Sequence, residues 1–302
     1  MNMYIDNTSI ANTFYFKLPQ HEQSFIKEKA LEYKFSHQEL KQIIDMSRDL
    51  GMWHEKNIID LFPVHSQRKV VFTRLRKLYE DIRDKPNSYK DFELKNIPKE
   101  QKYTFATENK DGFGLGLCPV ASEKTRCCNL LTLDAVESCG FDCSYCSIQS
   151  FYNQNTITFD SGFADKLLNL KLDQNKTYHI GTGQSSDSLM WGNREGILDA
   201  LFRFAKENPN VILEFKTKSD NIKHFLENDV PKNILCTYSL NTQTIIDNEE
   251  HLTASLNKRV SAARKLADKG VKVGFHFHPI VEYEGYLEEY NDVVYNRGSC
   301  TD

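Results

Sequence analysis

Three cysteines in the segment SCGFDCSYCSIQS have the spacing Cys139-x3-Cys143-x2-Cys146. Thiolates are soft ligands that favour zinc and iron–sulfur clusters. A structural zinc ion usually takes four protein ligands from two paired knuckles, and the sequence has no second knuckle. A cubane iron–sulfur cluster takes one thiolate on each iron, so three cysteines leave one iron open. We therefore expect a cluster whose fourth ligand is a small molecule, with zinc as the alternative.

The other cysteines are concentrated near this motif. Six of the eight cysteines lie between residues 118 and 146. Cytosolic thiols stay reduced, so clustering favours metal or redox chemistry over disulfides. Cys118, Cys127 and Cys128 precede the motif, and their simplest interpretation is as small buried thiols. Cys300 is most simply an incidental thiol.

The overall composition is that of a globular protein. Of the 302 residues, 40% are hydrophobic and 26% are charged, with a net charge of −4 and a pI near 6.2. This balance does not favour a large nucleic-acid-binding surface, although local basic runs such as HSQRKVVFTRLRK survive the averaging. The longest apolar runs are too short to cross a membrane, and the start lacks a basic flank before an apolar core. We expect a soluble, cytoplasmic protein.

The first part of the chain is predicted to be mainly helical. Apolar residues recur at helical spacing in the segments 21–35 and 36–53, and Ser36 with Glu39 forms a capping box at the start of the second. The patterns along the chain predict three regions: a mostly helical N-terminal region at 1–107, a linker loop with glycines and cysteines at 108–129, and an α/β region at 130–302.

After residue 130 short apolar strands alternate with amphipathic helices. This alternation predicts parallel strands joined by right-handed crossovers. In such folds ligands bind at the carboxyl ends of the strands, and four of these ends are polar: GTGQSSDS, KTKSDN, SLNTQT and HFHP. The expected strands are 130–136, 177–183, 211–217, 233–240 and 271–279, and the expected helices are 188–208 and 253–270, the second capped by Gly270.

The cysteine motif, with Tyr145 before its last cysteine, resembles the signature of radical S-adenosylmethionine (SAM) enzymes. Five segments, the motif included, resemble successive blocks of the spore photoproduct lyase family within that superfamily. The likeness covers about residues 118–295. The segments are CGFDCSYCSIQ, IGTGQSSDSL, LEFKTKSDNI, YSLNTQTII and RVSAARKLADKGVKVGFHFHPIVEYEGY.

This resemblance implies a partial (β/α)6 barrel, here shortened at its C-terminal end. The three cysteines would hold a [4Fe–4S] cluster, and the methionine end of SAM would chelate the open iron. Reductive cleavage of SAM gives a 5′-deoxyadenosyl radical that abstracts a hydrogen atom from the substrate. A flavodoxin- or ferredoxin-type protein would supply the electron. The family's best-known substrate is a UV-induced thymine lesion in DNA, so a DNA repair lyase is implied.

The resemblance also assigns residues to the SAM site. The backbone of the GTG segment would receive the SAM ammonium, with glycine allowing a close approach; an ordinary strand-to-helix turn is the alternative. We expect at most one of Lys216 and Lys218 to face the pocket, and Lys218, nearer the active end, would pair with the SAM carboxylate. Ser185, Ser186 and Asp187 would bond the ribose or cap the next helix. The residues expected around SAM are Tyr145, Gly181, Thr182, Gly183, Ser185, Lys218 and Ser239, with Asn241 as a further polar neighbour.

Two features bear on the substrate. His276 and His278 alternate on the last expected strand and share one face, where they would contact substrate or adenosine, or simply pack. The DNA-repair members carry a cysteine after the second strand that returns a hydrogen atom to the product radical, whereas Gln184 occupies about that place here. Lesion repair therefore requires another thiol, and the candidates are Cys236 and the upstream Cys118, Cys127 and Cys128, which resemble a cysteine-bearing segment of some relatives.

Other functions remain open from the sequence. The same chemistry could act on RNA, a peptide or a small molecule. A cluster could transfer electrons without cleaving SAM. The protein could also belong to a different functional class, as a non-catalytic zinc-bound module that binds nucleic acid. Oligomeric state is not determined by these patterns.

Overall fold

The computed structural model describes residues 13–90, 92, 102–112, 115–117, 130–147, 151 and 155–295. The chain divides into two compact units, Met1–Pro86 and Asn87–Asp302. The region boundaries predicted at 107 and 129 remain predictions. The upstream cysteines and the last cysteine lie outside the described residues: Cys118, Cys127, Cys128 and Cys300.

The first unit consists of amphipathic helices. The predicted capping box begins α3 (His37–Met52): Ser36 Oγ accepts from the Glu39 amide at 3.3 Å, and the Glu39 carboxylate accepts from the Ser36 amide at 2.7 Å. The apolar helix faces meet in a core of their own, where Ile44 and Leu50 are fully buried. The other elements are η1 (Tyr15–Lys17), α2 (Gln20–Tyr33), α4 (Ile58–Leu61) and α5 (Arg68–Arg83).

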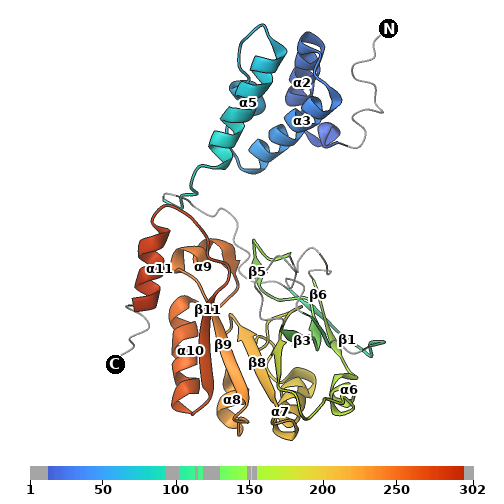
Figure 1. Ribbon diagram of the computed structural model, residues 1–302, viewed down its shortest axis with the longest axis vertical. Helices are drawn as coiled ribbons and strands as arrows, with labels where there is room; N and C mark the ends of the chain where they lie inside the picture. Colours follow the sequence, from blue (N-terminus) through green and yellow to red (C-terminus); the bar gives the residue numbers. More distant parts are fainter. Residues whose placement is uncertain are drawn as a thin grey trace. The chain divides into compact units, whose positions relative to one another are not determined.

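A six-stranded sheet forms the centre of the second unit (Figure 1). All hydrogen-bonded neighbours in it are parallel, except that the edge strand nearest the chain start is antiparallel to its neighbour. The five strands predicted after residue 130 are confirmed, and they lie side by side in chain order. From edge to edge the strands are β11 (Lys272–Phe277), β9 (Ile234–Leu240), β8 (Val211–Thr217), β7 (Tyr178–Thr182), β3 (Leu131–Leu133) and β2 (Leu115–Leu117).

Helices that follow the strands pack against one side of the sheet. Figure 1 shows α7 (Ile197–Glu207), α8 (Lys223–Glu227) and α10 (Leu256–Asp268) beside the strands. Their apolar side chains join those of the strands in one core, to which Phe215 and Tyr238 contribute fully buried rings. The remaining helices of this unit are α6 (Phe163–Leu168), α9 (Gln243–Glu249) and α11 (Tyr286–Tyr295).

One predicted helix is shorter than the sequence suggests. The segment 188–208 becomes helical only at Ile197, after turns and the short 3-10 element η3 (Arg194–Gly196). Gly192, Glu195 and Gly196 have φ values of 59°, 55° and 69°, which an α-helix cannot accommodate. By contrast, the predicted cap of α10 is confirmed, because Gly270 has φ 87° and its amide donates to the Ala267 carbonyl at 2.8 Å.

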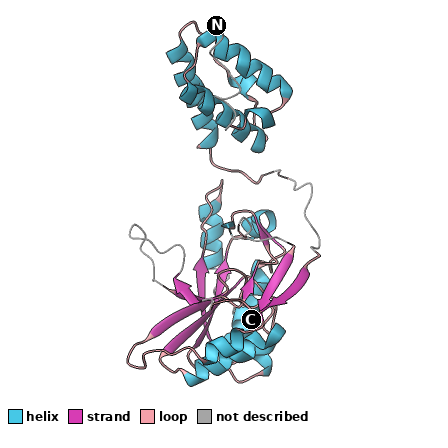
Figure 2. Ribbon diagram, turned by 90° about the vertical axis from the view of Figure 1, so that its right-hand side faces the viewer, coloured by secondary structure: helices cyan, strands magenta, loops and turns pink. Residues whose placement is uncertain are grey.

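Two small sheets complete the unit (Figure 2, strands in magenta). In one, β6 (Thr156–Asp160) pairs in parallel with β1 (Thr104–Glu108) and antiparallel with β4 (Val136–Glu137). In the other, β5 (Asp142–Cys143) pairs antiparallel with β10 (Glu250–His251). The β5–β10 pair matters for the site because it carries one of the clustered cysteines.

The second unit is therefore of the mixed α/β class that the sequence predicts. In the described part of the chain, none of the helices is both long enough and apolar enough to span a bilayer.

Candidate functional site

A pocket of about 470 Å³ lies at the carboxyl ends of the parallel strands. This volume is in the usual range for small-molecule sites. All four polar strand ends singled out in the sequence contribute to its wall, which confirms the expectation that they gather. The cysteine loop, residues 139–147, forms another part of the wall. Lining residues include Cys139, Cys143, Tyr145, Cys146, Gly183, Gln184, Asp187, Lys216, Lys218, Ser239, His276 and His278.

Backbone pairing holds the cysteine loop in place. Cys143 lies opposite Glu250 in the β5–β10 pair. The Ser144 amide donates to the Glu249 carbonyl at 2.9 Å, and the Cys146 amide donates to the Cys143 carbonyl at 3.0 Å. The loop is thus tied to a segment more than a hundred residues later in the chain.

Gly140 allows the loop to pack closely on its other side. A Cβ atom at this position would lie 2.7 Å from the ring of Trp191 and would also collide with Met190. The carbonyl of Gly140 accepts a hydrogen bond from the Tyr103 hydroxyl. A larger residue between the first two cysteines would therefore displace the loop.

Burial controls the acidity of the thiols. It raises the pKa of Cys139 to about 12 and holds that of Cys143 well above its ordinary value. The Lys218 ammonium acts in the opposite direction on Cys143, but its effect is smaller than that of burial. Without a metal, the thiols of Cys139 and Cys143 are therefore protonated at neutral pH, and metal binding would release their protons.

The thiols suit a ligand larger than one ion. In the part of the chain that the structure describes, no three His, Cys, Asp or Glu side chains lie close enough to hold a single metal ion. Cys139, Cys143 and Cys146 nevertheless line one pocket. A cubane takes each thiolate on a different iron, so this donor set fits a [4Fe–4S] cluster with one open iron better than it fits zinc.

A buried ion pair holds Tyr145. The Tyr145 hydroxyl donates to Oε1 of Glu250. Oε2 of Glu250 lies 2.6 Å from Nη2 of Arg259, and both side chains are fully buried. The Arg259 guanidinium also donates to the carbonyls of Ala254 at 2.7 Å and Ser239 at 2.8 Å. The pair therefore connects the cysteine loop to the end of β9.

Asp187 organises the segment that carries Lys218. Its Oδ2 accepts from the Lys218 amide at 2.7 Å, and its Oδ1 accepts from the Thr217 hydroxyl at 2.8 Å. Oδ1 also accepts from the amides of Leu189 at 3.0 Å and Met190 at 2.9 Å. Burial raises the pKa of Asp187, while these hydrogen bonds oppose the rise. The turn after β7 is thereby fixed to the end of β8.

Both Lys216 and Lys218 line the pocket, so the expectation that at most one would face it is wrong. Residues two apart on a strand point to the same side of the sheet. Lys218 lies nearer the cysteine loop, since its Nζ is 5.8 Å from the centre of the Tyr145 ring. Lys216 lies within β8, opposite Thr237 of β9.

Two more residues expected around SAM line the pocket. Gly183 has φ 77°, and a Cβ there would lie 2.7 Å from the Ser188 amide nitrogen, so glycine is required by the turn itself. The Ser239 hydroxyl donates to the His278 carbonyl at 3.3 Å. Contact of these residues with SAM stays a prediction.

Gly181, Thr182 and Ser185 are not among the lining residues. Each is engaged in packing or hydrogen bonding next to the pocket. A Cβ on Gly181 would meet the Leu130 side chain at 2.6 Å, the Thr182 hydroxyl donates to Ser188 Oγ at 2.8 Å, and the Ser185 amide donates to Asp134 Oδ1 at 2.9 Å.

Three further polar residues line the pocket. His276 and His278 both line it, as their alternation predicts. Burial, followed by the charge of Lys216, lowers the pKa of His276 to about 4, so this imidazole is neutral near pH 7. Gln184 also lines the pocket, and its buried Oε1 has no hydrogen-bond partner among the described residues.

Cys236 lies on the other face of β9. Its side chain is fully buried in the apolar core on the helix side, as is that of Tyr238. Since neighbouring residues of a strand point to opposite sides, Cys236 and Ser239 face away from each other. Cys236 is therefore not available as a hydrogen donor in the pocket.

Several residues of this site were not predicted from the sequence. Lys216 was detectable from its spacing to Lys218. Asp187 was considered only as a ribose contact or cap, and no local pattern predicts its four hydrogen bonds. Glu250 and Arg259 gave no signal, because charged residues in a helix and a short strand usually face solvent.

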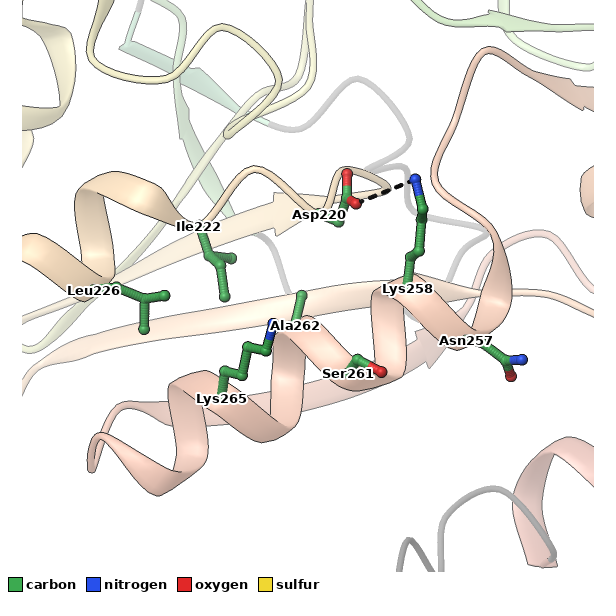
Figure 3. Close-up of a pocket in the computed structure, with 8 residues that line it drawn as sticks. All are labelled: Asp220, Ile222, Leu226, Asn257, Lys258, Ser261, Ala262 and Lys265. Atoms are coloured by element: carbon green, nitrogen blue, oxygen red, sulfur yellow. Dashed lines mark ion pairs between the residues drawn. The ribbon is translucent and has the colours of Figure 1, made fainter.

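Another hollow, of about 240 Å³, shares no lining residue with this pocket. It is lined by residues that follow β8 and by α10, including Asp220 and Lys258, which form an ion pair at 3.6 Å (Figure 3). None of its lining residues is a cysteine or histidine. The cysteine-lined pocket is therefore the candidate site.

Known proteins are similar to this chain in sequence and in fold. The spore photoproduct lyase of Clostridium acetobutylicum is 28% identical over 109 residues, 36% of this chain and 32% of that protein. The enzyme of Bacillus subtilis is 36% identical over 78 residues, 26% of this chain and 23% of that protein. The matched segments thus span a third or less of these relatives' length.

Solved structures show the same fold. Spore photoproduct lyase complexed with dinucleoside spore photoproduct superimposes with a TM-score of 0.55 at 20% identity, covering 76% of this chain and 71% of that chain. A mutant with bound SAM and the same lesion gives a TM-score of 0.54 with the same coverage. Finally, the family description "Spore photoproduct lyase" matches residues 93–298, which include the whole described pocket. The cysteine loop, the four polar strand ends and this match over most of the chain together show that the protein belongs to the spore photoproduct lyase family.

Proposed function

We propose that this chain is a radical SAM enzyme with a [4Fe–4S] cluster, and that it acts as a DNA lesion lyase of the spore photoproduct type. One observation carries the proposal: three thiols and a lysine from separate parts of the chain line a single pocket at the carboxyl ends of parallel strands. When bound, the cluster and SAM supply a 5′-deoxyadenosyl radical that abstracts a hydrogen atom from the substrate.

The residues of the pocket have distinct roles in this proposal. Cys139, Cys143 and Cys146 hold the cluster and leave one iron to SAM. Lys218, next to the cysteine loop, pairs with the SAM carboxylate. Ser239 and Tyr145 line the cofactor part of the pocket, with Tyr145 held by its hydrogen bond to Glu250. Gly181 and Thr182 at the end of β7, with Gly183 and Ser185 in the turn that follows, bring backbone polar groups toward the cofactor.

The sheet supports a partial barrel in this proposal. Five parallel strands in chain order, with helices on one side, are the arrangement expected for most of a (β/α)6 barrel. The pocket then occupies the inner side of the barrel. A flavodoxin- or ferredoxin-type reductant in the cytoplasm would deliver the electron, and DNA is the proposed macromolecular partner.

The final hydrogen donor is separate from these residues. Gln184 occupies the pocket position after β7, and Cys236 is buried on the opposite face. Lesion repair therefore depends on one of Cys118, Cys127 and Cys128, or on a donor other than a thiol.

Anaerobic reconstitution tests the proposal. The protein loaded with iron and sulfide should absorb near ~400 nm as thiolate-bound iron–sulfur clusters do. After reduction with SAM present, we expect 5′-deoxyadenosine, and with DNA carrying the thymine lesion we expect loss of that lesion. A colourless protein with stoichiometric zinc would contradict the radical SAM assignment, and 5′-deoxyadenosine without lesion loss would contradict the substrate.

A further inference from the structure

The geometry points to a second anion site in the pocket, formed by Lys216, which we propose binds a phosphate group of the substrate. The inference rests on the proposed function, because it assumes that Lys218 serves SAM and that the rest of the pocket serves the substrate. For a lesion that joins two neighbouring nucleotides, the group would be the phosphodiester between them.

The pocket contains more positive charge than its own acids neutralise. Lys216 and Lys218 both line it, and in the described part of the chain neither ammonium is within 4.0 Å of a carboxylate. A lysine that faces a pocket without a counter-charge favours an anion there. The SAM carboxylate and the cluster thiolates supply negative charge beside Lys218, which leaves Lys216 for a further anionic group.

The acids near the lysines already have other partners. Glu214, two residues before Lys216 on the same side of β8, interacts with His179 Nε2 at 2.8 Å and accepts from the Thr237 hydroxyl at 2.7 Å. The Asp187 carboxylate accepts four hydrogen bonds, three from backbone amides and one from a hydroxyl. Neither carboxylate is therefore free to compete strongly for the Lys216 ammonium.

The third acid close to the pocket is also engaged. Glu250 forms the buried ion pair with Arg259 at 2.6 Å and accepts from Tyr145. Like Lys218, it acts on the Cys143 thiol of the cysteine loop. No carboxylate of the described residues pairs with Lys216, so its positive charge can bind an anionic ligand.

Position separates the two lysines into a cofactor part and a substrate part. Lys218 lies over Tyr145 at 5.8 Å, and its charge acts on the Cys143 thiol. Lys216 lies two residues earlier in β8, opposite Thr237 of β9, and among the surrounding charges it has the largest effect on His276, ahead of Lys218. Lys218 is therefore the lysine at the cysteine loop, and Lys216 lies farther from the carboxyl end of β8.

The histidines complete a suitable surrounding for a phosphate. In the described residues, the rings of His276 and His278 have no hydrogen-bond partner, and both line the pocket. A neutral imidazole can donate one N–H to a phosphate oxygen, while the lysine supplies the charge. A wall of aliphatic side chains would offer neither a hydrogen-bond donor nor a positive charge.

Binding of matched probes to the cluster-loaded protein tests the inference. The probes are the dinucleoside lesion and the same lesion with its phosphodiester, measured by calorimetry in the presence of SAM. For Lys216→Met we expect the affinity for the phosphodiester probe to fall about 10- to 100-fold, as for loss of a charged hydrogen bond. The dinucleoside probe should bind unchanged, and Lys216→Arg should retain most of the affinity.

SAM binding by the same variants is the control. Lys216→Met should leave the affinity for SAM unchanged, whereas Lys218→Met should lower it. If Lys216→Met weakens SAM binding, or weakens both lesion probes equally, or affects neither, the inference is wrong. If SAM neither binds nor is cleaved by the parent protein, the proposed function itself is wrong.

Inorganic phosphate provides a test that does not depend on the lesion. Phosphorus NMR of the cluster- and SAM-loaded protein should show saturable line broadening that is lost in Lys216→Met and kept in Lys218→Met. Should neither lesion probe bind the parent protein, the substrate assignment fails. If the phosphate signal broadens equally in the parent protein and in Lys216→Met, the proposed anion site at Lys216 is wrong.

Discussion

The two faces of the central sheet contrast sharply although the same strands form both. On the helix side Phe215, Cys236 and Tyr238 are fully buried in an apolar core. On the pocket side the intervening residues are polar, among them Lys216 and Ser239. Because side chains alternate along a strand, each strand contributes at once to stability and to chemistry. Substitutions on the two faces should therefore have separable effects.

Arg259 is the exception to this division. It belongs to α10 on the helix side, yet its guanidinium reaches Glu250 and the Ser239 carbonyl at the edge of the pocket. Its charge is stabilised by an ion pair and by backbone carbonyls rather than by water. A substitution of Arg259 should therefore affect both the stability of the fold and the chemistry of the pocket.

The largest effect is expected on the pocket side. Cys143→Ala should abolish SAM cleavage, with a loss greater than the about 10- to 100-fold typical of a residue that only supports a metal ligand. Measurement of 5′-deoxyadenosine and of bound iron checks this. The matched control is Cys236→Ala, which should bind iron and cleave SAM normally; equal loss in both variants would refute the contrast.

Loss of the connecting ion pair should reduce stability strongly. Arg259→Met leaves the Glu250 carboxylate buried without its charged partner, which costs about 3–5 kcal/mol. Denaturant unfolding of the second unit measures this cost, and SAM cleavage should fall as Tyr145 loses its fixed hydrogen-bond acceptor. Arg264→Met on the same helix is the control, since Arg264 forms an exposed ion pair with Asp268 at 3.0 Å and should cost less than about 1 kcal/mol. Equal costs at the two positions would contradict this account of the pair.

A smaller loss of stability is expected when a polar atom is introduced into the core on the helix side of the sheet. Cys236→Ser places a more polar hydroxyl in the core next to the Tyr238 hydroxyl, and should reduce the free energy of unfolding by about 1 kcal/mol, the lower end of the usual range. SAM cleavage and lesion loss, assayed well below the unfolding temperature, should not change. Lesion repair that fails while stability is kept would show that Cys236 takes part in the chemistry.

The smallest effect concerns pH. The pKa of His276 is about 4 in the folded protein against an ordinary value of 6.5, so between these values the unfolded chain binds more protons. The free energy of unfolding should therefore decrease as pH falls from 6.5 toward 4, and the contribution should be absent above 6.5. His276→Gln should flatten this dependence. An unchanged slope in that variant would indicate that His276 is not buried as described.

Much of this architecture follows from local patterns. The five strands 130–279 were predicted because buried parallel strands are short, apolar and separated by amphipathic helices. The cysteine spacing and the polar strand ends indicated the site, since parallel strands bring their carboxyl ends to one edge. The capping box at Ser36 and the cap at Gly270 were predicted for the same reason: each depends on neighbours within a few residues.

Other features could not be predicted from neighbouring residues. The β5–β10 pair joins segments about a hundred residues apart. Nothing in the local sequences DCS (142–144) and EHL (250–252) distinguishes these strands from a loop. The late start of α7 depends on backbone angles at Gly192, Glu195 and Gly196 that helical spacing does not reveal. The expectation about Lys216 failed for a different reason, since the alternation rule itself predicts that it shares a face with Lys218.

The sequence by itself determined the donor atoms: three soft thiols at a fixed spacing, and polar groups at the end of each strand. Those properties are chemical and local, so they can be read from residue types. Only the tertiary structure decided which polar groups meet, which lysine faces the thiols and which cysteine is excluded. Such contacts depend on how distant segments pack and on the side of the sheet to which each residue points.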